Sequence, residues 1–274
     1  MVSVFHRALS SITRLAQRQN THGPEAPNGQ CIYAIGDIHG ERQCLDSLLA
    51  AISADFHQRF NEQDVRKIII FLGDYIDRGP DSRGVLDILC RLAAESRAGD
   101  GPACRFLCGN HETALLDFLA DPVAEAEWLS YGGAEPLASY GIRASTGITA
   151  PARCRALRDS LAERLPEAHR TFLDQLEPMV VLGDYAFVHA GIRPGIALER
   201  QRPEDLQRIR EPFLSSHRRH PKVIVHGHTP VAEAQILPNR IAVDTGAYAT
   251  GSLSAANLYG LEAKILTVAR RPGY

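Results

Sequence analysis

The sequence predicts an α/β fold, and three features indicate it. Short β-branched runs alternate with longer segments whose apolar residues recur at helical spacing. The early runs end in polar loops rich in glycine, as strands do at the edge of a sheet. The strand–loop–helix order then repeats three times, and such chains place their ligands at the carboxyl ends of the strands. We therefore expect a functional site at one sheet edge.

The first three units carry the polar loops. Predicted strands cover residues 31–36, 67–72 and 104–108. They end in Asp37-Ile38-His39-Gly40, Gly73-Asp74-Tyr75-Ile76-Asp77-Arg78-Gly79 and Gly109-Asn110-His111-Glu112. Helical spacing follows the first strand from Leu45 and the second over about residues 82–95, with Ser82 as the expected N-cap.

Residues 113–175 are mostly helical by pattern, with breaks at Tyr131-Gly132-Gly133 and Ser139-Tyr140-Gly141. This stretch is rich in Ala, Arg and Glu, which leaves little apolar surface for a second core. We therefore expect a helical insertion over the site and not a separate domain.

The second half of the chain reads as further strands. Gly183-Asp184 between two apolar runs predicts a hairpin over residues 179–188. Predicted strands over residues 223–225 and 241–243 follow, and a hairpin over residues 253–269 closes the chain. Their polar ends are His189-Ala190-Gly191, His226-Gly227-His228-Thr229 and Asp244-Thr245-Gly246.

The N-terminal segment, residues 1–30, is predicted to be a helix or tail followed by a linker. Residues 1–19 mix apolar and basic residues at roughly helical spacing, which favours a surface helix or frayed tail over a helix that binds a membrane or partner. Gly and Pro in residues 20–30 predict a flexible linker. Removing residues 1–28 is therefore expected to leave the main domain, residues 31–274, folded.

Composition excludes several classes of protein. The 274 residues are 45% hydrophobic and 23% charged, and the net charge of −2 leaves no electrostatic footprint for nucleic acid. No apolar run approaches the length of a membrane span, and Arg7 and Arg14 interrupt any signal-peptide core. The six cysteines lack a framework spacing and are expected to be free thiols. These features predict a cytoplasmic protein without a membrane or nucleic-acid partner.

The strand ends together supply a set of metal-binding residue types. Carboxylate, imidazole and amide groups suit borderline divalent metals such as manganese, iron or zinc. Six ligands exceed the three or four of a single zinc site, and one shared carboxylate fits a pair of cations used in hydrolytic phosphate chemistry. The candidates are Asp37, His39, Asp74, Asn110, His189 and His228.

These motifs resemble those of the phosphoprotein phosphatase family of metallophosphoesterases. The resemblance covers residues 31–260 and is carried by Gly-Asp-x-His-Gly, Gly-Asp-Tyr-x-Asp-Arg-Gly and Gly-Asn-His-Glu, in that order, with His189-Ala190-Gly191 and Gly227-His228-Thr229. It implies a β-sandwich of two mixed sheets flanked by helices, with two divalent ions at one sandwich edge. Manganese is the first expectation for the metal, and iron and zinc are the alternatives.

The resemblance also implies a role for each matching residue. The first metal would be held by Asp37, His39 and Asp74, and the second by Asp74, Asn110, His189 and His228. His111 would be the general acid and Asp77 the carboxylate that orients it. Arg78 and Asn110 would bind the substrate phosphate.

Two assignments leave alternatives open. The tract from Arg208 to Leu214 is similar to one in bacterial members of the family that supplies a second arginine for the phosphate. Arg210 is the first choice for this arginine, and Arg193 and Arg208 are alternatives. The tract could also be only a solvated basic helix face. His226 could replace His228 as ligand, although the Gly-His-Thr match favours His228. Trp128 and the following Tyr-Gly-Gly are also similar to bacterial relatives, and we expect a packed corner of the insertion there.

The resemblance implies a metal-dependent phosphomonoesterase, a serine/threonine protein phosphatase acting on phosphorylated proteins. A metal-bridging hydroxide would attack phosphorus in line while His111 protonates the leaving alkoxide. One alternative is hydrolysis of diadenosine tetraphosphate or related nucleotides, for which the ligand loops offer only Tyr75 and, farther off, Tyr248 as stacking rings, unless Tyr131 or Tyr140 folds over the site. The other is a non-catalytic phosphate-binding module, which would not need His111 with Asp77.

Overall fold

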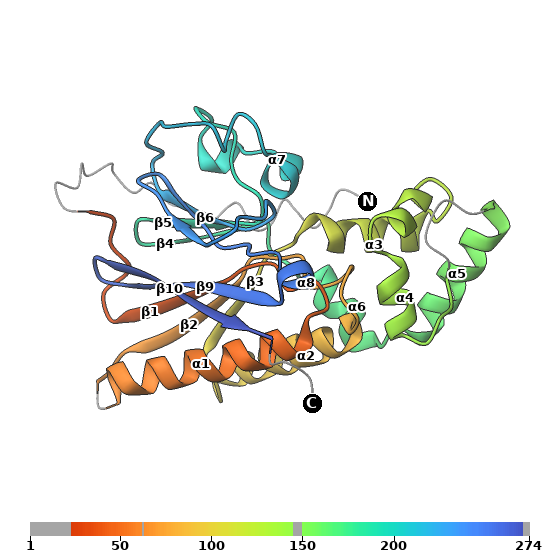
Figure 1. Cartoon of the computed structure of the whole chain (residues 1–274), viewed down its shortest axis with the longest axis horizontal. Helices are drawn as coiled ribbons and strands as arrows, with labels where there is room; N and C mark the ends of the chain where they lie inside the picture. The colour runs from red at the N-terminus through yellow and green to blue at the C-terminus, as the bar shows by residue number, and fades with distance from the viewer. Residues whose placement is uncertain (1–22, 62, 145–149, 271–274) are drawn as a thin grey trace.

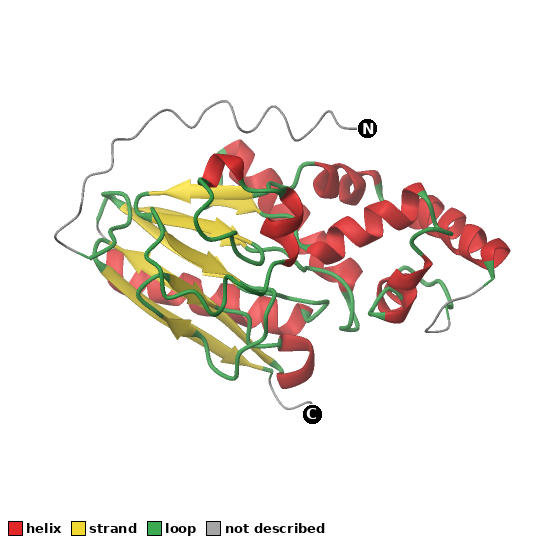
Figure 2. Ribbon diagram, turned by 90° about the horizontal axis from the view of Figure 1, so that it is seen from above, coloured by secondary structure: helices red, strands yellow, loops and turns green. Residues whose placement is uncertain are grey.

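Two five-stranded mixed sheets pack face to face in the computed structural model, which describes residues 23–61, 63–144 and 150–270 (Figures 1 and 2). In spatial order, the first sheet is β10 (Glu262–Ala269), β9 (Ser252–Tyr259), β1 (Gln30–Ile35), β2 (Arg66–Phe71) and β3 (Ala103–Phe106). The second is β4 (Met179–Leu182), β5 (Tyr185–Val188), β6 (Val223–His226), β8 (Arg240–Ala242) and β7 (Gln235–Ile236). The predicted α/β sandwich is confirmed, and only the short exposed strand β7 lacked a sequence signal.

The central strands are apolar on both faces because each face of the first sheet is covered. Ile32 and Ala34 of β1 pack with Phe187 and Val225 of the second sheet, in the core between the sheets. The alternate β1 residues Cys31, Tyr33 and Ile35 pack in the cluster that includes the outer helices. Period-two alternation is therefore hidden in β1 and β2, which read as continuous apolar runs.

Helices cover the outer faces of the sandwich (Figure 1). The long helices α1 (Arg42–Phe60) and α2 (Ser82–Ala98) lie on the first sheet. On the second sheet, apolar residues of α7 (Pro203–Arg208) and the following loop pack against β5 and β6. Two short helices lie in connections between strands: η3 (Leu198–Arg200) follows β5, and α8 (Ala247–Thr250) joins β8 to β9.

The predicted insertion is helical and lies at the end of the sandwich where the chain leaves β3 (Figure 2). Its breaks fall near the two predicted Gly-containing stretches. The helices are α3 (Asn110–Ala120), η2 (Ala126–Ser130), α4 (Ala134–Ser139), α5 (Pro151–Arg164) and α6 (Glu167–Asp174).

The start of α2 differs from the expectation. Ser82 is the first helical residue, and the N-cap is Asp81, whose carboxylate accepts the Gly84 N–H at 2.8 Å. The hydroxyl of Ser82 instead accepts the backbone N–H of Asp77 at 3.1 Å. Ser82 thus ties the helix start to the polar loop after β2.

Residues 24–28 are hydrogen-bonded to the main domain and Ala26 is buried, so the prediction of a flexible linker is wrong for this part of the segment. Ala26 is only 2% exposed, and its N–H donates to the Gly260 carbonyl at 2.8 Å. The carbonyl of Glu25 accepts the Asp184 N–H at 2.9 Å. The Gly-Pro composition indicated irregular backbone correctly, but such backbone can still dock on a sheet. Residues 1–19, the predicted helix or tail, lie outside the described residues.

A chain lacking residues 1–28 is expected to melt about 4–8 °C below a chain lacking residues 1–22. The longer deletion removes these contacts of Ala26 and Glu25, worth about 2 kcal/mol together, and about 1 kcal/mol corresponds to 2–4 °C at this size. Differential scanning calorimetry of the two truncated chains measures this difference. Equal melting temperatures would show that the contacts of residues 24–28 add no net stability.

No disulfide joins any of the six cysteines, all of which are described, in agreement with the expectation. Within the described ranges, no helix combines the length and apolar character needed to cross a bilayer.

Candidate metal centre

The polar loops meet in unusual backbone conformations. In the described part of the chain, five residues other than glycine have φ in the left-handed region, with values from 46° to 72°. Each costs roughly 1 kcal/mol or more relative to ordinary backbone, and such residues cluster at functional sites. They are His39, Asp74, Asp77, Arg78 and His228, all of which the sequence analysis singled out.

Two glycines leave room for the carboxylates of the site. A Cβ atom on Gly109 would lie 2.1 Å from Asp74 Oδ1, and one on Gly227 would lie 2.0 Å from Asp37 Oδ1. Any other residue at position 109 would displace the Asp74 carboxylate, and any other residue at position 227 would displace that of Asp37. This explains why glycine precedes Asn110 and His228.

The carboxylate of Asp74 lies between two groups of histidines. Its Oδ2 atom is 3.6 Å from His39 Nε2, whereas its Oδ1 atom is 3.3 Å from His189 Nε2. Candidate ligand atoms lie within 4.8 Å of one another in two groups, His39 with Asp74 and His111, and Asp74 with His189 and His228. Asp74 belongs to both groups, as a carboxylate shared by two metal ions must.

The ring orientations of two histidines suit metal binding. His39 Nδ1 donates to the Ile76 carbonyl and His189 Nδ1 to the Leu72 carbonyl, each at 2.8 Å. Backbone carbonyls that accept from Nδ1 leave Nε2 as the ligand atom. Burial lowers the pKa of His39 to about 3, so the imidazole is neutral at pH 7. Burial alone would lower the pKa of His189, but the Asp74 carboxylate outweighs it and raises that pKa.

Asp37 and Asn110 lie at the edges of these groups. Both carboxylate oxygens of Asp37 accept the His228 N–H, at 3.1 and 3.0 Å. Asn110 Oδ1 is 3.1 Å from His189 Nε2. Asp37 is not in the first group, where the third member is His111. The expected first-metal set is thus only partly assembled, since His39 and Asp74 meet there without Asp37.

The carboxylates fit a cationic partner. Burial, with repulsion from Asp244 and Asp74, raises the pKa of Asp37 well above its usual range. Positive charge among these carboxylates would relieve that repulsion, and the donor set of carboxylate, imidazole and amide suits borderline divalent metals. The residues therefore fit divalent ions, while manganese as the particular metal stays a prediction.

An acid dyad adjoins Asp74. His111 Nδ1 lies 2.5 Å from Asp77 Oδ2, and the His111 N–H donates to Asp74 Oδ1 at 3.1 Å. Because an ionised carboxylate can only accept, Nδ1 carries the proton, and Nε2, on the other side of the ring, accepts from Arg78 at 3.1 Å. Burial alone would lower the pKa of His111, but Asp74 and Asp77 together raise it. A raised pKa favours the protonated ring that a general acid requires.

Three residues near the dyad make contacts that the sequence did not predict. Glu112, which is fully buried, accepts the N–H groups of Asp74, Tyr75 and Gly109 at 2.8–3.0 Å and so joins two loops. The Trp128 indole donates to Asp77 Oδ2 at 2.8 Å. The Tyr248 ring lies 4.8 Å from the Arg78 guanidinium and 5.3 Å from the His39 ring. Glu112 and Trp128 stand in motifs that the sequence analysis quoted, whereas only packing reveals these contacts.

The arginines differ in how they are engaged. Arg78 donates to His39 Nε2 at 3.2 Å and to His111 Nε2 at 3.1 Å, so it lies at the centre of the site. Arg193 forms two hydrogen bonds to Asp205, at 2.9 and 2.6 Å. Burial and the charge of His189 lower the pKa of His228 to about 3, and the positive charge of Arg210 contributes a smaller part of this shift. The charge of Arg208 acts instead on Asp117 and Tyr131. The charge of Arg210 thus reaches His228, while its role as the second phosphate arginine stays a prediction.

His226 points away from the metal groups. Its ring is fully buried against Phe213, with the ring centres 5.0 Å apart, and its Nε2 has no hydrogen-bond partner in the part of the chain that the structure describes. His228, two residues later, is the one in the second group.

Of the four tyrosines considered as stacking rings, two are buried and two are partly exposed. Tyr75 is fully buried and its hydroxyl donates to the Leu107 carbonyl at 2.6 Å, so it cannot stack on a substrate. Tyr140 is also buried, with its hydroxyl 2.7 Å from His169 Nδ1. Tyr131 and Tyr248 are 42% and 36% exposed, and their rings flank His111 and His39.

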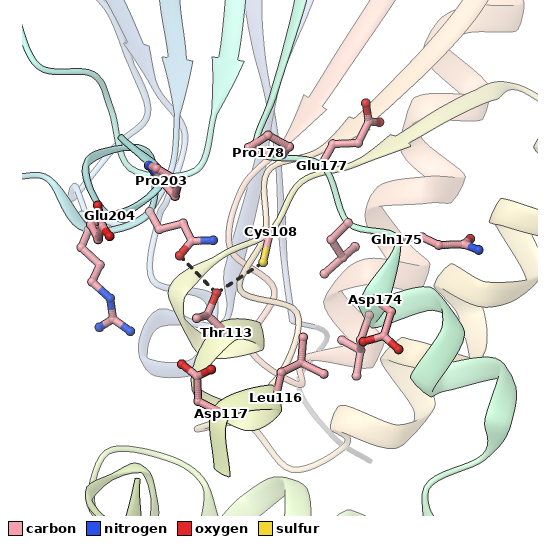
Figure 3. A pocket seen from close by; sticks show the side chains of 14 residues that line it. Cys108, Thr113, Leu116, Asp117, Asp174, Gln175, Glu177, Pro178, Pro203 and Glu204 are labelled. Atoms are coloured by element: carbon pink, nitrogen blue, oxygen red, sulfur yellow. Dashed lines mark hydrogen bonds between the residues drawn. The ribbon is translucent and has the colours of Figure 1, made fainter. Parts of the chain in front are cut away.

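A separate cavity of about 600 Å³ lies beside α3 (Figure 3). The Thr113 hydroxyl at its wall lies 3.5 Å from the Cys108 thiol and 3.1 Å from Gln207 Oε1. None of the described metal-group or dyad residues lines it, but Cys108 and Thr113 flank the motif that carries Asn110 and His111. Its carboxylates are Asp117, Asp174, Glu177 and Glu204, against the single cation of Arg208.

The chain is similar to two kinds of bacterial protein. Over 240 residues the chain is 28% identical to serine/threonine-protein phosphatase 1 of Salmonella typhimurium, covering 85% of this chain and 94% of that protein. It is 23% identical over 240 residues to a bis(5'-nucleosyl)-tetraphosphatase PrpE of Oceanobacillus iheyensis, covering 82% and 87%.

Solved structures share the fold. A crystal structure named as a diadenosine tetraphosphatase superposes with a TM-score of 0.61 at 23% identity, covering 93% of this chain and 96% of that one. A cold-active protein tyrosine phosphatase superposes with a TM-score of 0.51 at 16% identity, covering 88% and 81%. The family model for calcineurin-like phosphoesterases matches residues 32–259, which include every strand-end motif described above. The chain belongs to the calcineurin-like phosphoesterase family.

Proposed function

We propose that this protein is a phosphomonoesterase that removes phosphate from phosphoserine and phosphothreonine in proteins, with two divalent ions, manganese first. The acid dyad is the observation that carries the proposal, because His111 Nδ1 is held at 2.5 Å by Asp77, so that Nε2 would face the reacting group once Arg78 has turned to the phosphate. The alkoxide of serine or threonine is a strong base and departs slowly unless it is protonated. A buried, oriented imidazole supplies that proton.

The residues around the dyad would bind the phosphate. Arg78 lies between His39 and His111 and would turn its two terminal nitrogens onto phosphate oxygens. To do so it must release two ring nitrogens, Nε2 of His39, which would bind a metal, and Nε2 of His111, which would face the leaving group. Asn110 beside His189 and the exposed Arg210 near His228 would bind the remaining oxygens. When bound, the ions would supply an activated water and offset the phosphate charge.

Two further proposals concern the domain bounds and the place of action. We propose residues 31–274 as the catalytic domain, with residues 113–175 as an insertion that contributes to the site through α3. We also propose that the enzyme acts in the cytoplasm on phosphorylated proteins, as its composition suggests.

The dyad favours a phosphomonoester over a polyphosphate. Cleavage of a phosphoanhydride releases a phosphate group, which is a weak base and needs an acid less than an alkoxide does. The carboxylates around the cavity beside α3 would also repel a polyphosphate chain, whereas they suit basic side chains of a peptide.

Nucleotide hydrolysis is the second candidate, and Tyr131 and Tyr248 favour it. Both rings are partly exposed beside His111 and His39, where they could stack on a nucleobase. Relatives of similar identity carry either name, a protein phosphatase or a bis(5'-nucleosyl)-tetraphosphatase, so sequence similarity does not separate the two candidates.

With manganese, kcat/KM for a phosphothreonine peptide is expected to exceed that for diadenosine tetraphosphate at least about tenfold, or about 1.4 kcal/mol in the transition state. Steady-state kinetics under matched metal and pH measure both values. The Tyr131→Leu variant serves as the control, because a ring that stacks only on a nucleobase does not act on a peptide. The variant should therefore leave the peptide reaction unchanged within about twofold. The reverse order of kcat/KM, with a selective loss on the nucleotide in Tyr131→Leu, would assign the enzyme to nucleotides.

A further inference from the structure

The helical insertion reaches the acid dyad through one side chain. Trp128, on η2, is fully buried, and its indole Nε1–H donates to Asp77 Oδ2 at 2.8 Å. The same oxygen holds His111 Nδ1 at 2.5 Å. The other oxygen, Oδ1, is buried and has no hydrogen-bond partner among the described residues. Both side-chain bonds of this carboxylate therefore converge on one oxygen.

This asymmetry determines how the carboxylate is oriented. A carboxylate bound only to His111 could rotate and offer either oxygen, which would tilt the imidazole with it. The indole N–H lies on a second, independent element and bonds to Oδ2 alone, so it selects one rotation. A charge-assisted hydrogen bond of this kind is short and directional. Loss of the donor leaves the buried carboxylate with a single partner.

The indole is itself held in place. Its ring packs on Phe118 of α3 with ring centres 4.9 Å apart. A Cβ atom on Gly133 would lie 2.5 Å from the ring, so only glycine lets the chain close over the indole. Gly133 N–H donates to the Trp128 carbonyl at 3.0 Å, and the Gly132 carbonyl accepts the Arg78 N–H at 3.3 Å. The corner at residues 128–133 thus contacts Asp77 and Arg78, two consecutive residues of the catalytic loop.

We infer that Trp128 is a positioning residue of the acid dyad, whose indole N–H fixes the Asp77 carboxylate so that His111 presents Nε2 to the leaving group. The expected packed corner is present, and the indole N–H adds a function to it. The inference rests on the proposed function in one respect, the acid role of His111. It assigns the insertion a part in leaving-group protonation.

Trp128→Phe tests the inference because it removes the N–H and keeps most of the aromatic volume. With a phosphothreonine peptide, kcat is expected to fall about tenfold, equivalent to about 1.4 kcal/mol, while KM stays within twofold. With nitrophenyl phosphate, whose leaving group is a weak base, kcat should fall less than about threefold. Metal content should be unchanged, since Trp128 contacts neither metal group.

Two further variants separate positioning from packing. Phe118→Leu loosens the contact on the indole and keeps the N–H, so it should lower the melting temperature without a difference between the two substrates. In an Asp77→Asn background, Trp128→Phe should cost less than about twofold, because the partner that it acts through has changed. Equal losses on both substrates, or full additivity with Asp77→Asn, would overturn the inference.

A spectroscopic measurement tests the contact without activity. Trp128 is the only tryptophan, so the protein has a single indole ¹H–¹⁵N signal. Asp77→Asn should shift this signal, and Asp81→Asn, at the N-cap of α2, should not. If Trp128→Phe does not fold, replacement by the benzothiophene analogue of tryptophan removes the N–H at nearly constant shape. An indole signal that Asp77→Asn leaves unchanged would contradict the contact, whatever substrate the enzyme acts on. Failure of the wild-type enzyme to hydrolyse phosphomonoesters would contradict the proposed function and not the contact.

Discussion

Replacement of Asp74 by asparagine is expected to remove both metal ions together and to lower kcat by more than about 100-fold, because even outer partners of metal ligands cost 10- to 100-fold. The structure gives the reason. Oδ1 faces His189 and Oδ2 faces His39, so each oxygen serves a different group. An amide turns one oxygen into a donor, which repels one cation, and removes the charge that attracts both.

Elemental analysis of the purified variant, with calorimetry to confirm folding, measures the effect. Asp37→Asn is the matched control, because Asp37 is assigned to one metal only and should leave the second ion bound. Asp159→Asn, on the exposed face of α5, should change nothing. Two ions per chain and full activity in Asp74→Asn would contradict the shared carboxylate.

Replacement of His111 by asparagine is expected to lower kcat for a phosphothreonine peptide by roughly 100- to 10,000-fold, the range for a lost general acid. The backbone N–H that donates to Asp74 stays, so the metal ions should stay as well. Nitrophenyl phosphate should lose much less, because its leaving group departs without a proton.

Steady-state kinetics on both substrates and metal analysis of His111→Asn provide the measurement. His57→Asn, on the exposed side of α1, is the control for histidine replacement and should behave as the wild type. An equal loss on both substrates would refute the acid role, and a loss of metal would place His111 among the ligands, as its membership of the first group allows.

The metal groups could be predicted from the sequence because each ligand follows a buried strand directly. His39, Asp74 and His189 lie within four residues of a strand end, and neighbouring strands bring those ends together. Local pattern therefore brings these side chains to one edge of the sandwich. It does not determine the distances between them: Asp37, expected in the first group, lies outside it and accepts the His228 N–H.

The contacts that the sequence did not predict depend on packing between distant segments. Trp128 and Asp77 are 51 residues apart, and their hydrogen bond exists because the insertion folds back on α3. Tyr75 follows Asp74 directly, but its ring points into the core, and sequence position alone did not reveal this. Residues 24–28 read as a linker because glycine and proline indicate turns, whereas mobility depends on what the segment packs against.

The left-handed residues of the site set stability against function. At each of the five positions glycine would relieve the left-handed backbone, which contributes roughly 1 kcal/mol toward stability. The same change would delete a side chain assigned to metal, acid or phosphate. Selection for heat resistance alone would therefore erode the centre one residue at a time, and a thermostable variant is best sought in the helices and the closing hairpin, away from these loops.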